Sequence, residues 1–195
     1  MIASLRKVVI VVAIANLAYF GVEFTVAAAT GSVSLFADSI DFLEDASVNI
    51  LIAYALRWSA TGRARLGMAL AGILLIPGLA TLWTAWGKLV APVPPAPLPL
   101  SLTGLGALAI NVACAFMLAG FRGHSGSLTR AAFLSARNDT VANLAIIATG
   151  FGTAYTHSGW PDLFVGLGIA AMNFDTAREV WRAARTEHRA AADQP

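Results

Sequence analysis

The stretch Thr30–Asn49, TGSVSLFADSIDFLEDASVN, places acidic side chains inside one of the most apolar regions of the chain. Four acids fall within eight residues, with no Lys or Arg among them: Asp38, Asp41, Glu44 and Asp45. At 100° per residue of an α-helix, these side chains share an arc of about 120°. Asp41 and Asp45 are one turn apart, so their carboxylates can share a ligand. The stretch predicts a helix with one strongly acidic face.

The composition of the whole chain is typical of a membrane protein. Of its 195 residues, 57% are hydrophobic and only 12% are charged, and the mean hydropathy is +0.70. Soluble domains are about 45–50% apolar and about 25% charged, so we expect a polytopic membrane protein. The net charge of +2 and the scattered basic residues exclude a nucleic-acid-binding patch. The single cysteine, Cys114, excludes an intrachain disulfide and a cysteine-rich metal site.

Six segments are long and apolar enough to cross a bilayer, which takes about 20 residues of helix. We expect them at about Leu5–Ala29, Ser32–Trp58, Leu66–Val90, Leu102–Phe121, Leu128–Thr153 and Pro161–Ala184. The stretch 91–100, APVPPAPLPL, predicts a stiff extended connector between the third and fourth spans. The sequence therefore predicts an all-α fold with six transmembrane helices in residues 1–187. Residues 188–195 are expected to form a short cytoplasmic tail without a soluble domain.

The basic residues indicate the orientation of these spans. In a six-span arrangement, Lys and Arg of the short loops gather on one side of the membrane, and only Lys88 lies on the other. Short cytoplasmic loops carry the excess of Lys and Arg in membrane proteins. We therefore expect both termini in the cytoplasm, in an integral protein of a plasma membrane such as the bacterial inner membrane.

The acids need an explanation because a charge at the centre of a bilayer costs about 2.5–3.5 kcal/mol on insertion scales. They have to face the interior of the helix bundle, where they need a cation, a proton or both. The fifth span repeats the pattern, since Ser135 and Asp139 are one turn apart with Asn138 and Asn143 beside them. Arg137 is the only basic residue deep in a span and neutralises at most one acid. The remaining carboxylates form a site suited to a divalent metal ion, and metal binding there would release protons.

Structural roles are the alternative for these acids. Asp38 and Asp45 could cap helix breaks, and Asp139 could pair with Arg137 or with Arg130 of a neighbouring helix. Glu44, at the edge of the acidic face, is a candidate ion-pair partner of Arg137.

Other polar residues have a functional and a structural interpretation. Asn16, Glu23 and Asn111 lie within predicted spans, where hydrogen bonding between helices is the default role. Glu23 is also a candidate proton carrier. His124, between the fourth and fifth spans, is either a solvated loop residue or a relay for metal toward the site.

Residues 16–45, NLAYFGVEFTVAAATGSVSLFADSIDFLED, resemble the first two spans of the cation diffusion facilitator family. Residues 130–147, RAAFLSARNDTVANLAII, are similar to the fifth span of that family. TGRARLG at 61–67 and GWPDLFVGLGIAAMNFDTAREV at 159–180 resemble its turn after span two and its last span. The resemblance covers nearly the whole chain, with six spans in order.

The resemblance implies a set of metal ligands. The transport site of the family takes two ligands from span two and two from span five, which correspond here to Asp41, Asp45, Asp139 and Ser135. Ser135 stands where His or Asp is usual, and Asp38, Asn138, Glu23 and His124 are possible auxiliary residues. Oxygen ligands suit Mn²⁺, Mg²⁺ or Fe²⁺, but they also bind Zn²⁺, Co²⁺, Ni²⁺ and Cd²⁺. The family favours Zn²⁺, which is therefore the first candidate.

The resemblance also implies the function. We expect a transporter, not an enzyme, that exports a divalent transition-metal ion from the cytoplasm by metal/proton antiport and works as a homodimer in the bilayer. Family members commonly carry a soluble cytoplasmic domain after span six, so this chain is expected to be a form without it. The alternative is a degenerate transporter fold with a structural or assembly role and no transport, which Ser135 favours. An intramembrane hydrolase with an Asp41/Asp45 dyad is disfavoured, because no peptidase-like motif accompanies the pair.

Overall fold

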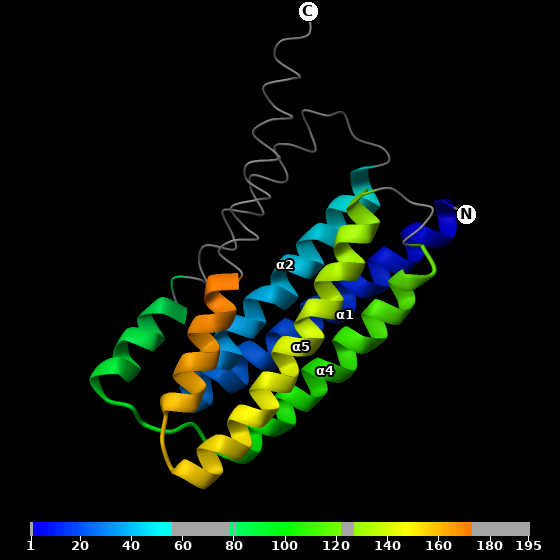
Figure 1. Cartoon of the computed structure of the whole chain (residues 1–195). Helices are drawn as coiled ribbons and strands as arrows, with labels where there is room; N and C mark the ends of the chain where they lie inside the picture. The colour runs from blue at the N-terminus through cyan, green and yellow to red at the C-terminus, as the bar shows by residue number, and fades with distance from the viewer. Residues whose placement is uncertain (1, 56–78, 80, 122–126, 173–195) are drawn as a thin grey trace, which may run out of the picture.

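The computed structural model describes residues 2–55, 79, 81–121 and 127–172 (Figure 1). The four long helices of this part are α1 (Ile2–Thr30), α2 (Val33–Ala55), α4 (Pro97–Ala119) and α5 (Ser127–Thr156). Two shorter helices are formed by residues 81–90 and by Trp160–Met172, and are called helix 81–90 and helix 160–172 below. No strand occurs within the described residues. The predicted all-α, six-span membrane class is confirmed.

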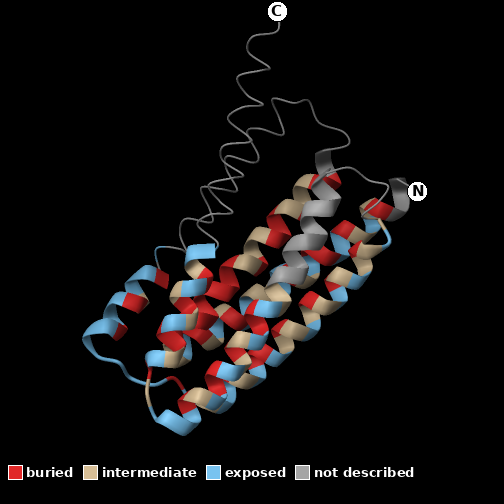
Figure 2. Cartoon of the chain, viewed as in Figure 1, coloured by how far each residue is buried: buried red, intermediate tan, exposed pale blue. Residues whose placement is uncertain are grey.

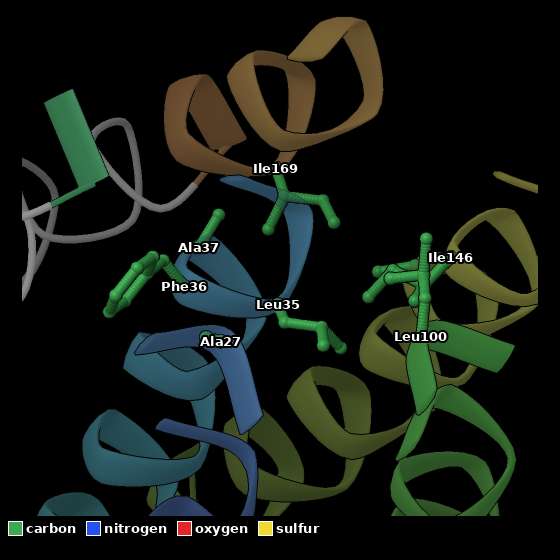
Figure 3. Packing of buried hydrophobic residues seen from close by; sticks show 8 residues of the cluster. Ala27, Leu35, Phe36, Ala37, Leu100, Ile146 and Ile169 are labelled. Carbon is green, nitrogen blue, oxygen red and sulfur yellow. The ribbon is translucent and has the colours of Figure 1, made fainter. Parts of the chain in front are cut away.

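The four long helices form one bundle. α1 packs against α2 and α4, and α5 packs against α4 and α2 (Figure 1). An apolar cluster joins all four of them to helix 160–172, and Figure 3 shows how its side chains meet. Its buried members are Ala27, Leu35, Phe36, Ala37, Leu100, Ala142, Ile146 and Ile169. This packing places α2 in the middle of the molecule, with neighbours on several sides.

Local sequence explains where α2 and α4 begin. Gly31 adopts a φ of 65°, which glycine tolerates without a Cβ clash, and this turn separates α1 from α2. Ser32 then accepts a hydrogen bond from the backbone N–H of Leu35 at 3.2 Å, as an N-cap does. α4 begins at Pro97 because proline is favoured in the first turn of a helix. The predicted connector therefore ends before residue 97, and the predicted start near Leu102 was late.

The side chains follow the pattern expected of a lipid-facing bundle. Large apolar residues point outward, and Phe116 and Phe151 are 77% and 68% exposed. Asn16, Glu23 and Asn111 are almost completely buried. Figure 2 shows that exposed residues lie on the outer faces of the helices and buried residues face the middle of the bundle. A soluble protein has the opposite distribution, so the outer surface is suited to hydrocarbon.

Length and composition alone identify only part of this membrane domain. Within the described residues, Leu5–Thr30 and Pro97–Ala119 are helices long and apolar enough to span a bilayer. α2 is less apolar because it carries Asp38, Asp41, Glu44 and Asp45. The predicted tail 188–195, His124 and most of the predicted third span, 66–90, lie outside the described residues.

Candidate metal site

Three of the predicted acidic ligands lie on two neighbouring helices. Asp41 and Asp45 lie on α2 and Asp139 lies on α5, which packs against α2. The charge of Asp139 acts on Asp41, and Asp139 in turn experiences the charge of Asp45. Asp45 is 4% exposed, and the other two carboxylates are partly buried. The three acids therefore share one electrostatic environment, which we call the metal layer.

The metal layer is strongly negative. Asp38 and Glu44 add their charges to those felt by Asp41 and Asp139. One oxygen of Asp139, Oδ2, is buried without a hydrogen-bond partner among the described residues. In the same part of the chain, no Lys or Arg forms an ion pair with Asp41 or Asp139. Buried carboxylates that act on one another's charge are stabilised by cations or protons.

The complete ligand set stays a prediction. Within residues 2–55, 79, 81–121 and 127–172, no three His, Cys, Asp or Glu side chains lie close enough together to hold a metal ion. The backbone of α5 places Ser135 one turn before Asp139, on the same helix face. The side chains of Ser135 and Asn138, and the whole of His124, lie outside the described part.

A second polar layer lies one helical turn from the metal layer, toward the end of the bundle where α2 begins. Asn143 Nδ2 donates to Asp38 Oδ2 at 2.6 Å, and Asn111 Nδ2 donates to Asn143 Oδ1 at 3.0 Å. All three residues are at most 2% exposed. Because they come from α2, α5 and α4, this chain of hydrogen bonds joins three helices. With Glu23 of α1, we call these residues the carboxyl–amide layer.

Glu23 completes this layer from α1. Its side chain is completely buried, and its carboxyl group lies close to that of Asp38. No N–H or O–H group of another described residue donates to either oxygen of Glu23. Oxygen Oδ1 of Asp38 is likewise buried without a hydrogen-bond partner among the described residues. Two buried carboxyl groups so near each other are more stable when one of them carries a proton.

The structure corrects two of the structural alternatives. α2 runs without a break from Val33 to Ala55, so neither Asp38 nor Asp45 caps a helix break. Asp38 bonds Asn143 instead. The predicted hydrogen bonding between helices is confirmed for Asn111, and Asn16 Nδ2 faces Cys114 Sγ at 3.9 Å. The proposed pairing of Glu44 with Arg137 involves a side chain outside the described part.

Sequence reasoning missed one buried charge pair. The sequence places Lys88 alone among the Lys and Arg residues on one side of the membrane and Asp162 at the start of the last predicted span, without indicating that they pair. Their side chains form an ion pair, and both are buried. A signal for the pair existed, because an acid inside a span with no basic neighbour needs a partner, and Lys88 is the only basic residue on that side.

Comparison with known proteins agrees with this architecture. A family model described as the cation efflux transmembrane domain matches residues 9–187. The match includes the three acids of the metal layer and the four residues of the carboxyl–amide layer. None of the curated proteins compared with the chain is similar enough to match it.

Proposed function

We propose, because this chain belongs to the cation efflux family, that it carries a divalent transition-metal ion across the bilayer through a site between α2 and α5. Members of this family are membrane transporters of divalent metal cations and not enzymes. The chain is accordingly an integral membrane protein with a cation-transport domain. The substrate, the site and the mode of transport are argued below from its residues.

The observation that carries the site assignment is the unpaired negative charge of Asp41 and Asp139 on two packed helices. The charge of Asp139 acts on Asp41, that of Asp45 acts on both, and neither Asp41 nor Asp139 pairs with a basic residue in the described part of the chain. A divalent ion held by Asp41, Asp45 and Asp139, with Ser135 as a fourth ligand, would neutralise most of this charge. Rocking the two helices apart at one end and then the other would expose such an ion to each side of the membrane in turn.

The donor set bears on the choice of metal. Three carboxylates and a hydroxyl provide oxygen only, which suits Mn²⁺ and Fe²⁺ and also accommodates Zn²⁺, Co²⁺, Ni²⁺ and Cd²⁺. We take Zn²⁺ as the first candidate because the family resemblance favours it. The donor set makes a panel of ions necessary in any assay.

Protons are the proposed counter-ion. The closeness of the buried carboxyl groups of Glu23 and Asp38 supports this, because such a pair favours a bound proton, which would be shared one turn away from the metal layer. In the cycle that we propose, cytoplasmic metal displaces protons from the carboxylates, the bundle rocks, and metal leaves as protons return. We also propose that both termini lie in the cytoplasm of a bacterial cell and that the transporter acts as a homodimer.

Metal flux into proteoliposomes tests the proposal. The purified protein is reconstituted with a metal-sensitive dye inside the vesicles, and Zn²⁺, Mn²⁺, Fe²⁺, Co²⁺, Ni²⁺ and Cd²⁺ are added outside in turn. We expect flux of at least one ion, lowered at least tenfold in Asp139→Asn, which keeps the shape of the side chain but removes its charge. Thr149→Val is the matched control, because the Thr149 hydroxyl donates to the carbonyl of Ala145 in its own helix.

Equal flux in wild type and Asp139→Asn would refute the site assignment. Failure of the wild type to move any ion of the panel would instead favour the alternative of a transporter fold with a structural or assembly role. A metal gradient that dissipates without acidifying or alkalinising the vesicle interior would refute the proton counter-ion and leave the metal site standing.

A further inference from the structure

The Asp162 carboxylate joins three helical elements outside the two polar layers. It lies in the first turn of helix 160–172 and is completely buried. Its Oδ1 accepts hydrogen bonds from the hydroxyls of Ser32 and Ser34 at 2.6 and 2.7 Å and from the backbone N–H of Ser34 at 3.2 Å. Its Oδ2 accepts from the backbone N–H of Val33 at 2.9 Å and from Lys88 Nζ at 3.0 Å. Both oxygens are therefore fully used.

These bonds fix the beginning of α2. The first N–H groups of a helix have no acceptor within the helix itself, and a negative charge is favoured beside them. Here the charge comes from another helix, so the cap is also a tie between α2 and helix 160–172. Lys88, 6% exposed, adds helix 81–90 to the same tie. Removing one partner of a buried charge pair leaves the other uncompensated, so the loss of either Asp162 or Lys88 would disturb this contact.

Gly166, one turn further along helix 160–172, packs against the same start of α2. A Cβ atom at this position would lie 2.7 Å from the backbone nitrogen of Ser34 and 2.7 Å from a side-chain carbon of Val33. The two backbones therefore touch directly. Buried Val33, Ala85 and Leu163 form an apolar cluster beside this contact. α2 can neither slide nor rotate at this end without breaking the contact.

The tie lies on the face of α2 that leads to the metal layer. Ser34, Asp38, Asp41 and Asp45 point within about 60° of one another, and Asp41 lies about 10 Å along the helix from Ser34. A rotation of α2 by about 30° would move a side-chain atom about 5 Å from the axis by roughly 3 Å. Metal–ligand distances tolerate only about 0.2 Å. The rotational setting of α2 therefore decides whether its acids meet Asp139.

We propose that Asp162 is a positioning residue for cation transport, which holds α2 in the setting that presents Asp41 and Asp45 to α5. Helix 81–90 and helix 160–172 act together as the anchor, with Lys88 and Gly166 completing it. The transport half of this inference rests on the proposed function. The structural half concerns the placement of α2 relative to α5 and is measured without any metal.

The first experiment measures that placement directly. Spin labels are attached to cysteines introduced at Leu51 on α2 and Val141 on α5, in a Cys114→Ser background, and the distance between them is measured by pulsed electron paramagnetic resonance. Asp162→Asn places an amide N–H₂ group among the donors of Val33, Ser34 and Lys88. We therefore expect the distance distribution to shift or broaden by about 2 to 3 Å, which is the displacement that a rotation of α2 by about 30° would cause.

Gly166→Ala tests the same anchor by a different route, so the inference stays falsifiable if Asp162→Asn folds poorly. We expect it to change the label distances as well. Gly168→Ala on the same helix is the matched control, because a Cβ there meets nothing within 4 Å. Unchanged distances in both Asp162→Asn and Gly166→Ala would overturn the inference, whether or not the protein transports metal.

The second experiment asks whether the placement matters for transport. Flux is measured over a range of metal concentrations and normalised to the amount of folded transporter. We expect Asp162→Asn and Gly166→Ala to raise the half-saturating metal concentration at least tenfold, whereas a purely structural role would lower only the yield of folded protein. Unchanged half-saturation despite shifted label distances would refute the positioning role. A wild type that moves no metal would refute the proposed function, which is a separate failure.

Discussion

Replacing Asn143 by alanine removes two hydrogen bonds of the carboxyl–amide layer at once. The bond that Asn143 donates to Asp38 has a carboxylate acceptor, and such bonds contribute about 1.5–3 kcal/mol. The bond that Asn143 accepts from Asn111 is neutral and contributes about 0.5–1.5 kcal/mol. Measured values between membrane helices average about 0.6 kcal/mol with a maximum near 1.7. We therefore expect Asn143→Ala to lower the free energy of unfolding by about 2–3 kcal/mol.

The assay is reversible unfolding of the purified protein in mixed micelles, followed by circular dichroism. Asn111→Ala is the matched comparison, because it removes only the neutral bond, and we expect a loss of about 0.5–1.5 kcal/mol. The loss of stability in the double variant should be smaller than the sum of the losses in the two single variants, because both single variants remove the same Asn111–Asn143 bond. An Asn143→Ala loss no larger than that of Asn111→Ala would refute the inference that Asn143 supports the Asp38 carboxylate.

Further predictions concern α1. Gly106→Ala should destabilise the protein by about 1–3 kcal/mol in the same assay, because a Cβ there would collide with the hydroxyl of Tyr19, whereas Gly21→Ala, with open space around it, should not destabilise it. A Gly106→Ala variant as stable as wild type would contradict the packing of α1 on α4. Glu23→Gln should stay within about 1 kcal/mol of wild-type stability, because its amide can donate to Asp38 in place of the shared proton, while Glu23→Ala should lose more. Equal losses in the two Glu23 variants would count against the shared proton.

The periodicity of the sequence predicted the central feature of the fold. The acidic face of α2 follows from the spacing of its acids, and a charged face in an apolar chain has to point into the bundle. The structure has a continuous α2 from Val33 to Ala55 that packs against α5. Both inferences depend on residues close together in the sequence, where helix geometry fixes their relation.

Contacts between distant residues were the part that the sequence did not predict. Lys88 and Asp162 are separated by 74 positions, and Asp38 and Asn143 by 105. Nothing in local periodicity decides which polar residue of one helix meets which residue of another. The start of α4 was missed for a different reason, because prolines in the sequence were interpreted as connector although Pro97 is well suited to the first helical turn.

The central claim is that the carboxylates of α2 and α5 bind a divalent metal ion, and isothermal titration calorimetry of the purified protein tests it most directly. Zn²⁺, Mn²⁺ and Co²⁺ are titrated into wild type, Asp45→Ala and the Thr149→Val control. We expect saturable binding of at least one ion to wild type and to the control, and its loss in Asp45→Ala. Absence of binding by every ion, or binding that Asp45→Ala leaves unchanged, would contradict the claim.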